Sequence, residues 1–377
     1  MNNVPNLRFN EFSGEWESLK ISETLKIKHG RDQKKIQVED GIYPILATGG
    51  EIGRTNIPLY DKESVLIGRK GTIDKPIYMN SPFWTVDTLF YSEIKNNMVP
   101  KFIFYKFQNI NWRKYCEASG VPSLSASTIE GIRYNVPQKQ EQEKIASFFS
   151  LIDKKIELQT EKVEELKNYK KGIMQKIFSQ ELRFKDENGN EYPEWEEHTL
   201  GKLIKVKSIR NKDNKVELVL SVSNTKGFIT QAEQFEDRVV ASSDISNYKI
   251  VEKDDFAFNP ARINVGSIAR LKTHEKGIVS PMYVCFNCLN LLDSSYFEYF
   301  LMTHSFDVQM KKKLEGSVRQ TLSAEALSEI KIKLPTLLEQ KKIGEFLNKI
   351  SAKIEKEEVK LVQLEKYKKG LLQQMFI

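Results

Sequence analysis

The chain has 377 residues, 40% of them hydrophobic, which is enough for two or more domains with their own cores. Its net charge of +7 favours a polyanionic partner. Its three cysteines, an odd number in a long chain, favour a reducing compartment, and the sequence shows neither an apolar leader nor an apolar run of 18 residues. We therefore expect a cytoplasmic protein that is neither secreted nor membrane-spanning.

The first block, residues 1–136, is predicted to consist of short strands and turns. It opens with Leu7-Arg8-Phe9, a turn at Ser13-Gly14, and Trp16. Runs rich in β-branched and aromatic residues, separated by glycines, predict strands at 43–47, 64–67, 76–78 and 83–91. A helix is expected at 101–108, before a basic, aromatic segment.

The second block, residues 181–334, repeats this order. It opens with Leu182-Arg183-Phe184 and Trp195, and strands are predicted at 217–222, 256–258, 267–271 and 278–286, with a helix at 295–303. The opening follows the first long helix almost directly, whereas its counterpart for the second long helix stands at the N-terminus. We therefore expect a circular repeat in which the two chain ends lie close together.

The stretches 124–178 and 322–376 are an internal duplication. They align without a gap at an offset of 198, and 22 of the 55 aligned positions are identical. Apolar positions recur every three or four residues in each copy, which predicts a long amphipathic helix at 137–180 and another at 335–377. A helix of roughly 40 residues is about 60 Å long, too long to be buried in one compact domain, so each needs a partner helix.

We predict that these two helices pair in an antiparallel orientation with one block at each end. The side chains expected to form helix–helix or subunit contacts are Ile145, Phe148, Ile152, Ile156, Leu166, Tyr169, Ile343, Phe346, Ile350, Ile354, Leu364 and Tyr367.

Patterns for catalysis are weak. Asp87, followed by Glu93 and Lys95, has the loose form of a nuclease carboxylate cluster, so a single-chain restriction endonuclease remains an alternative. The Asn259-Pro260 pair lacks the second proline and the aromatic residue of an adenine methyltransferase motif, and no glycine-rich cofactor turn accompanies it. A turn that ends a strand is the better interpretation of that pair.

Cys285 and Cys288 have the spacing of half a zinc site, but no second pair follows, so buried thiols in a strand are favoured. The four histidines are scattered, and the sequence lacks a phosphate-binding Gly-x-x-x-x-Gly-Lys loop. We therefore predict no catalytic residue, no metal and no cofactor in this chain.

Basic and polar loops are the strongest candidates for a binding site. Residues 68–72 and 262–267 place Arg, Lys and Asn beside glycines, which allow close backbone approach. Arg reads guanine and Asn reads adenine in the major groove, while Lys, Ser and Thr mostly hold phosphates. Solvated loops are the alternative for any single residue. The candidate DNA-binding residues are Thr48, Arg54, Arg69, Lys70, Thr72, Ser119, Ser123, Lys226, Arg262, Asn264, Ser317, Arg319 and Gln320.

Each variable block is followed by a helix with the same start, Pro137-x3-Glu141-Gln142 in one copy and Pro335-x3-Glu339-Gln340 in the other, and the same Tyr-Lys-Lys-Gly end. Over essentially its whole length this arrangement resembles the specificity subunit of Type I restriction-modification enzymes. The resemblance implies an α+β fold: two mixed α/β target-recognition domains, at 1–136 and 181–334, separated by a pair of long helices that form an antiparallel coiled coil, in a pseudo-twofold circular repeat.

The resemblance also implies that each target-recognition domain reads half of a bipartite site in double-stranded DNA, and that the chain is not catalytic by itself. Two modification subunits, which bind S-adenosylmethionine and methylate adenine, would dock on it. Restriction subunits would add ATP-dependent cleavage with Mg²⁺. A coiled-coil scaffold that does not touch DNA remains a further alternative.

Overall fold

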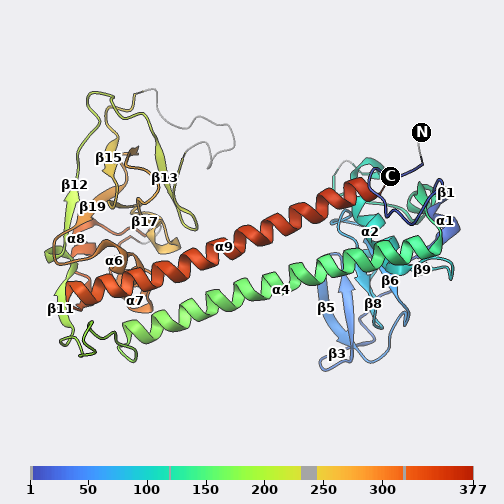
Figure 1. The fold of residues 1–377 in the computed structure, drawn as a ribbon, viewed down its shortest axis with the longest axis horizontal. Helices are drawn as coiled ribbons and strands as arrows, with labels where there is room; N and C mark the ends of the chain where they lie inside the picture. The colour runs from blue at the N-terminus through green and yellow to red at the C-terminus, as the bar shows by residue number, and fades with distance from the viewer. Residues whose placement is uncertain (1–2, 119, 231–243, 317–319, 377) are drawn as a thin grey trace. The chain divides into compact units, whose positions relative to one another are not determined.

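The computed structural model describes residues 3–118, 120–230, 244–316 and 320–376. The chain divides into two compact units: unit 1 is Met1–Lys162 with Glu357–Ile377, and unit 2 is Val163–Lys356. The long helices α4 (Lys139–Phe178) and α9 (Leu337–Met375) each contribute one part to each unit (Figure 1). Below, the part of unit 1 outside these two helices is called the first head, and that of unit 2 the second head. None of the helices in the described ranges is both long and apolar enough to cross a membrane.

The first head is built from short strands and short helices. Its strands are β1 (Glu17–Lys20), β2 (Leu25–Lys28), β3 (Gln37–Val38), β4 (Tyr43–Ala47), β5 (Gly50–Thr55), β6 (Ser64–Gly68), β7 (Ile77–Met79), β8 (Trp84–Thr85), β9 (Leu89–Ile94) and β10 (Arg133–Val136). Its helices are α1 (Ile21–Thr24), α2 (Pro100–Asn109), the 3-10 helix η1 (Trp112–Tyr115) and α3 (Ala126–Gly131). The sheets have the strand orders β2-β9-β6-β7 and β3-β5-β4-β8, and β1 pairs with β10.

The core of unit 1 lies where the first head meets both long helices. The ring of Phe376, just past the end of α9, lies 5.5 Å from Phe102 of α2 and 5.9 Å from Phe149 of α4, between ring centres. Phe149 belongs to the N-terminal part of α4, so the start of one long helix packs beside the end of the other. The helices are therefore antiparallel within this unit.

The second head repeats the plan with other strand lengths. Its strands are β11 (Glu196–Thr199), β12 (Ile204–Lys207), β13 (Leu220–Ser223), β14 (Gly227–Thr230), β15 (Lys249–Glu252), β16 (Phe256–Phe258), β17 (Ile268–Arg270), β18 (Lys276–Val279), β19 (Val284–Cys288) and β20 (Lys331–Leu334). Its helices are η2 (Leu200–Lys202), η3 (Ile263–Val265), α6 (Ser294–Phe300), α7 (His304–Lys312) and α8 (Ala324–Ser328). One sheet has the order β12-β19-β16-β17, and the pairs β13-β14, β15-β18 and β11-β20 complete the head.

Unit 2 has its own buried core. The rings of Phe256 and Phe286 stack at 5.4 Å beneath Phe297 of α6, which lies 5.1 Å from Phe256. Ile177, near the end of α4, and Ile343, near the start of α9, are fully buried in the same cluster. The two long helices are antiparallel here as well, and the predicted α+β fold with two mixed heads on paired long helices is confirmed.

Two equivalent backbone hydrogen bonds show the circular repeat. The N–H of Leu182 donates to the carbonyl of Lys176, where α4 runs directly into the second head, at 3.0 Å. In unit 1 the N–H of Leu7 donates to the carbonyl of Gln374 at the same distance, and Gln374 is the counterpart of Lys176 at the offset of 198. The N-terminal segment and the end of α9, which lie side by side in Figure 1, therefore form the junction that a continuous chain forms in unit 2.

Two predicted strands are each broken in two. The stretch 83–91 contains β8 and the start of β9, separated by a turn in which the Leu89 N–H donates to the Val86 carbonyl. The stretch 278–286 contains the end of β18 and the start of β19, separated by a turn at Ser280 and Pro281. Proline cannot donate to a strand ladder, which explains the second break. The error came from reading continuous apolar runs as single strands.

Candidate nucleic-acid interface

The first candidate loop follows β6 and is held on both sides by the backbone. The Arg69 N–H donates to the Thr88 carbonyl and the Gly71 N–H to the Pro122 carbonyl, each at 2.8 Å. The Leu124 N–H donates back to the Arg69 carbonyl at 2.9 Å. Because its main-chain groups are paired inside the head, the loop presents its side chains from a rigid frame.

Glycine is required at two positions of this loop. A Cβ added to Gly68 would lie 2.2 Å from the Thr72 carbonyl oxygen and 3.1 Å from Cγ2 of Thr48. Gly71 has φ of +84°, in the left-handed region that side chains rarely adopt. The tight turn therefore brings the tip of the β4–β5 hairpin, at Thr48, against the loop.

The structure gathers five of the predicted DNA-binding residues of the first head on this loop and its neighbours: Thr48, Arg69, Lys70, Thr72 and Ser123. Lys70 is exposed and bridges to Ser123 through the backbone. Arg69 is 34% exposed, and its Nη1 lies 3.6 Å from a carboxylate oxygen of Asp87. The Arg69 guanidinium is thus oriented but still accessible to solvent.

Two predicted residues of the first head do not join this group. The Arg54 guanidinium is bound to Glu51 and to the carbonyls of Gly41 and Ile42, within its own hairpin region. Ser119 lies outside the described residues.

The second candidate loop follows β16 and is closed by its own turn. The Asn259 side chain accepts a hydrogen bond from the Ala261 N–H, and the Ser267 N–H donates to the Arg262 carbonyl, both at 3.1 Å. The Leu322 N–H donates to the Pro260 carbonyl at 3.1 Å. Leu322 is the duplicate of Leu124, so the same residue of each repeat holds the loop after the equivalent strand.

Arg262 and Asn264 are exposed on this loop, on either side of the buried Ile263. Gly266, with φ of +88°, places its Cα so that an added Cβ would lie 3.4 Å from the Asn224 carbonyl, in the β13–β14 turn that also carries the exposed Lys226. Three predicted residues therefore lie at the same end of the second head.

The remaining predicted residues of the second head lie in the segment that leads to Leu322. Gln320 is exposed two residues before Leu322, while Ser317 and Arg319 are outside the described residues.

Sequence reasoning missed the buried contact that seats each long helix on its head. In unit 1, Glu141 is fully buried and accepts two hydrogen bonds from Arg8, at 2.7 and 2.8 Å, and one from the Trp16 indole at 3.3 Å. The Gln142 amide accepts from the Val99 N–H at 3.0 Å and donates to a carbonyl at the helix start. We call these contacts of Arg8, Trp16, Glu141 and Gln142 the helix seat.

Unit 2 has the same seat. Glu339 is fully buried and accepts from Arg183 at 2.9 and 3.3 Å and from the Trp195 indole at 3.3 Å. Gln340 accepts from the Asp293 N–H at 2.8 Å. The signal was present in the sequence, since the Arg, the Trp and the Glu-Gln pair recur in both copies, but nothing in one dimension showed that they meet.

The predicted contact residues of the long helices divide into buried and exposed groups. Buried residues are Ile145, Ile152, Ile343 and Ile354, and partly buried ones are Phe148, Ile156, Leu166, Phe346, Ile350 and Leu364. Tyr169 and Tyr367 are 53% and 59% exposed. The lysine of each Tyr-Lys pair contacts the head, because the Lys170 ammonium lies over the Tyr299 ring and the Lys368 ammonium over the Tyr105 ring. The two tyrosines therefore stay predictions for a subunit contact only.

The residues considered for catalysis do not form a common site. Asp87 pairs with Arg69, Glu93 lies 3.3 Å from Lys28, and the Lys95 ammonium donates to the Ser22 carbonyl. Within the described ranges no group of three or more His, Cys, Asp or Glu side chains is placed to hold a metal ion.

The two cysteines considered for zinc lie in β19. Burial raises the pKa of Cys285 and of Cys288 to about 12. Both thiols are therefore protonated at neutral pH, and Cys285 is buried while Cys288 is partly buried.

The duplicated heads, loops and seats correspond to a known class of proteins. The family model for the Type I restriction modification DNA specificity domain matches residues 13–168 and again residues 192–366, so the chain belongs to this family. Each matched segment takes in most of one head and most of the long helix that follows it.

Individual relatives extend this result. The chain is 25% identical over 398 aligned residues to the specificity subunit of the Type I restriction enzyme MjaVIII of Methanocaldococcus jannaschii, covering 95% of this chain and 91% of that one. It is 24% identical to the putative MjaX specificity subunit of the same organism, over 74% of this chain and 67% of that one. The solved structure of a Type I restriction-modification S subunit from M. genitalium shares the fold, with a TM-score of 0.65, 18% identity and 99% of each chain covered.

Proposed function

We propose that this chain is the DNA-recognition subunit of a Type I restriction-modification complex and reads a bipartite site with its two heads. The observation that carries the proposal is the pair of loops at 68–72 and 259–267. Leu124 and its duplicate Leu322 hold them in the same way, but they present different side chains. One frame with two different reading surfaces is what recognition of two unlike half-sites requires. Family membership supports the same conclusion.

In this proposal the target-recognition domains are residues 1–136 and 181–334, and the helices at 137–180 and 335–377 set the spacer between half-sites. Arg69 and Arg262 are the proposed base readers, because Arg binds guanine in a bidentate manner. Lys70, Thr72, Lys226 and Gln320 supply phosphate or sugar contacts.

The chain is proposed to work in the cytoplasm with partners that supply the chemistry. Two modification subunits would bind S-adenosylmethionine and methylate adenine, and restriction subunits would use ATP and Mg²⁺ for cleavage. Tyr169 and Tyr367 are duplicates of each other and both are more than half exposed. A repeated exposed aromatic residue suits two copies of one partner, since exposed tyrosines are common anchors of protein interfaces.

The test is to express the chain with its modification subunit in a host without adenine methylation and to sequence the genomic DNA for modified adenines. We expect two short specific sequences separated by a nonspecific spacer, and no such motif without this chain. Methylation that did not depend on the chain, or cleavage of plasmid by the purified chain with Mg²⁺ alone, would overturn the proposal.

A second measurement separates DNA recognition from a scaffold that never touches DNA. Binding of the purified chain to a duplex should weaken steeply as salt rises, because each neutralised phosphate releases counterions. A chain that bound no duplex, or whose binding did not weaken with salt, would favour the scaffold.

A further inference from the structure

The loops at 68–72 and 259–267 are called the reading loops below. In each unit a network of polar side chains joins the sheet that carries the reading loop to one long helix. Its last member is Asn348 of α9 in unit 2 and Ser150 of α4 in unit 1. These two positions are duplicates at the offset of 198 but carry different residues. The connection is therefore a built feature of both units, with chemistry that differs between them.

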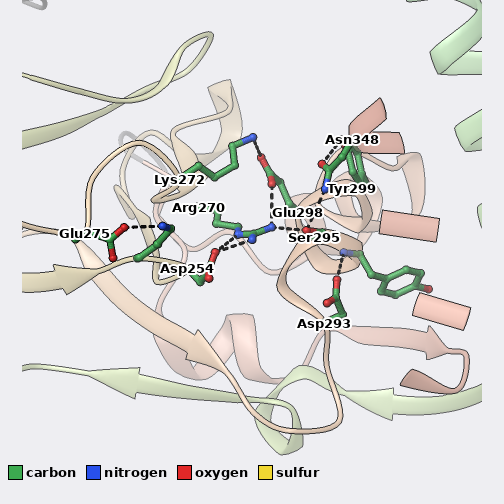
Figure 2. Close-up of polar contacts among 11 residues, drawn as sticks. Asp254, Arg270, Lys272, Glu275, Asp293, Ser295, Glu298, Tyr299 and Asn348 are labelled. Atoms are coloured by element: carbon green, nitrogen blue, oxygen red, sulfur yellow. Dashed lines mark hydrogen bonds and ion pairs between the residues drawn. The ribbon is translucent and has the colours of Figure 1, made fainter. Parts of the chain in front are cut away.

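In unit 2 the polar network begins at Arg270, on the edge strand β17. Its Nη1 donates to the Ser295 hydroxyl of α6 at 2.6 Å, and the Asn348 amide of α9 donates to the same oxygen at 3.3 Å (Figure 2). A Cβ added to Gly344 of α9 would lie 2.8 Å from the Ser295 Cβ, so glycine allows the two helices to approach closely here.

Carboxylates on both sides hold the Arg270 guanidinium in place. Asp254 lies 2.6 Å from its Nη2, and an oxygen of Glu298 lies 3.6 Å from its Nη1 (Figure 2). The other Glu298 oxygen accepts from Lys272 at 2.7 Å. The Arg270 side chain is only 15% exposed, which restricts its rotamers further.

In unit 1 the corresponding polar network uses other groups. The Lys101 ammonium of α2 donates to the Ser150 hydroxyl at 3.2 Å and lies 5.6 Å from the ring centre of Tyr78 on β7. β7 pairs with β6, and β17 pairs with β16 in the same way. Both polar networks therefore start on the strand beside the one that leads into the reading loop. A cation over a ring is less directional than a paired guanidinium.

A tyrosine beside each polar network shows that the two networks lie at corresponding positions of the two units. The Tyr299 hydroxyl donates to Asn348 at 2.8 Å, and its ring centre lies 5.0 Å from the Lys170 ammonium of α4. In unit 1 the Tyr105 hydroxyl lies 3.5 Å from Ser150, and its ring centre lies 5.4 Å from Lys368, the duplicate of Lys170. Each head is thus attached to both long helices at the same place.

We propose that Arg270 and Asn348 are positioning residues for reading the second half-site. β17 starts two residues after Gly266 of the reading loop, so a shift of Arg270 relative to Asn348 changes how the loop is set on α9. The side chains touch no DNA themselves; they restrict the orientations in which the second head can meet its half-site. This inference rests on the proposed function.

The experiment uses the complex of this chain with its modification subunit, acting on a DNA library in which the half-sites are constant and the spacer varies. The measured quantity is the spacer ratio: methylation at spacers one base pair longer or shorter than the natural one, divided by methylation at the natural spacer. For Arg270→Met we expect the spacer ratio to rise about tenfold, the change that about 1.4 kcal/mol of lost discrimination gives. Asn348→Ala should raise the ratio in the same direction, and Asn348→Ser, which restores the group found at Ser150, should reverse most of that rise.

Lys253→Met is the matched control. Lys253 pairs with Glu275 on the surface of the same head, and both side chains are more than half exposed. The control should keep the spacer ratio of the wild type. Thermal unfolding is measured for every variant, and if Arg270→Met does not fold, the two Asn348 variants carry the test.

An unchanged spacer ratio in Asn348→Ala, or an equal loss of methylation at all spacers, would overturn the inference and leave these residues a purely structural role. If the wild type itself shows no bipartite motif, the proposed function fails first. The two failures are therefore distinguishable.

Discussion

The two heads agree where they meet the long helices and differ where they face outward. Both seats use Arg, Trp, Glu and Gln with nearly the same hydrogen bonds. The reading loops, by contrast, differ in length and in most side chains around one left-handed glycine, Gly71 or Gly266, and the Leu124 or Leu322 contact. A buried carboxylate tolerates little change because every lone pair must be satisfied, whereas an exposed loop can change its side chains freely once its backbone is held.

The largest effect is expected from breaking a seat. Glu141→Ala leaves the Arg8 guanidinium, which is only 13% exposed, without its partner. Removing one member of a buried ion pair costs about 3–5 kcal/mol of unfolding free energy. Urea unfolding of the variant should show this loss. Glu143→Ala, exposed two residues further along the same helix, should stay within about 0.5 kcal/mol of the wild type. Equal stabilities for the two variants would contradict the importance of the seat.

The next effect concerns the frame of one reading loop. Gly68→Ala forces a Cβ against the Thr72 carbonyl and should cost about 1–3 kcal/mol, with loss of discrimination at the first half-site only. Gly49→Ala, where an added Cβ meets nothing within 4 Å, is the control. Methylation of a library with both half-sites randomised checks this prediction. A variant that lost both half-sites equally would show that the frames are not independent.

More specific changes, without a loss of stability, should follow from the side chains themselves. Arg69→Ala should relax base preference at one half-site, and Arg262→Ala at the other, each by about 1–3 kcal/mol. Binding to nonspecific duplexes should hardly change. If either variant instead weakened binding to all sequences alike, that arginine would be a phosphate contact and not a base reader.

The smallest effect is expected on the pH dependence of stability, from a contact between the two long helices that involves neither head. In unit 1, hydrogen bonds from Gln159, Lys360 and Lys162 lower the pKa of Glu357 from 4.5 to about 2. A lowered carboxylate pKa stabilises the fold fully above about 4.5, and this contribution is lost as the pH falls towards 2. Glu357→Gln should therefore flatten the dependence of stability on pH between about 4.5 and 2. Glu161→Gln, exposed on α4, should leave the wild-type slope.

The sequence predicted the repeating parts well and the contacts between unlike residues poorly. The offset of 198 predicted both long helices and the meeting of Leu7 with the end of α9, because periodicity and duplication are visible along the chain. The pairing of Arg8 with Glu141, 133 residues apart, leaves no local pattern. The polar network of Arg270, Ser295 and Asn348 is still harder to predict from the sequence, because unit 1 makes the corresponding connection with different residues.

The proposed base-reading residues are the part of the site that the sequence alone predicts least. Composition grouped Arg69 and Lys70, which lie on the held loop, together with Arg54, whose guanidinium is bound within its own hairpin region. A basic residue beside a glycine is a weak signal until the partners of its side chain are known.

Lengthening both long helices is the most direct test of the proposal that they set the spacer between the two half-sites. The same four residues would be inserted into α4 and α9 at the unit boundary, near the hydrogen bond from Gln159 to Glu357, which adds about 6 Å to each helix. We expect a methylated motif with both half-sites unchanged and a longer spacer. An unchanged spacer with both half-sites intact would contradict the proposal.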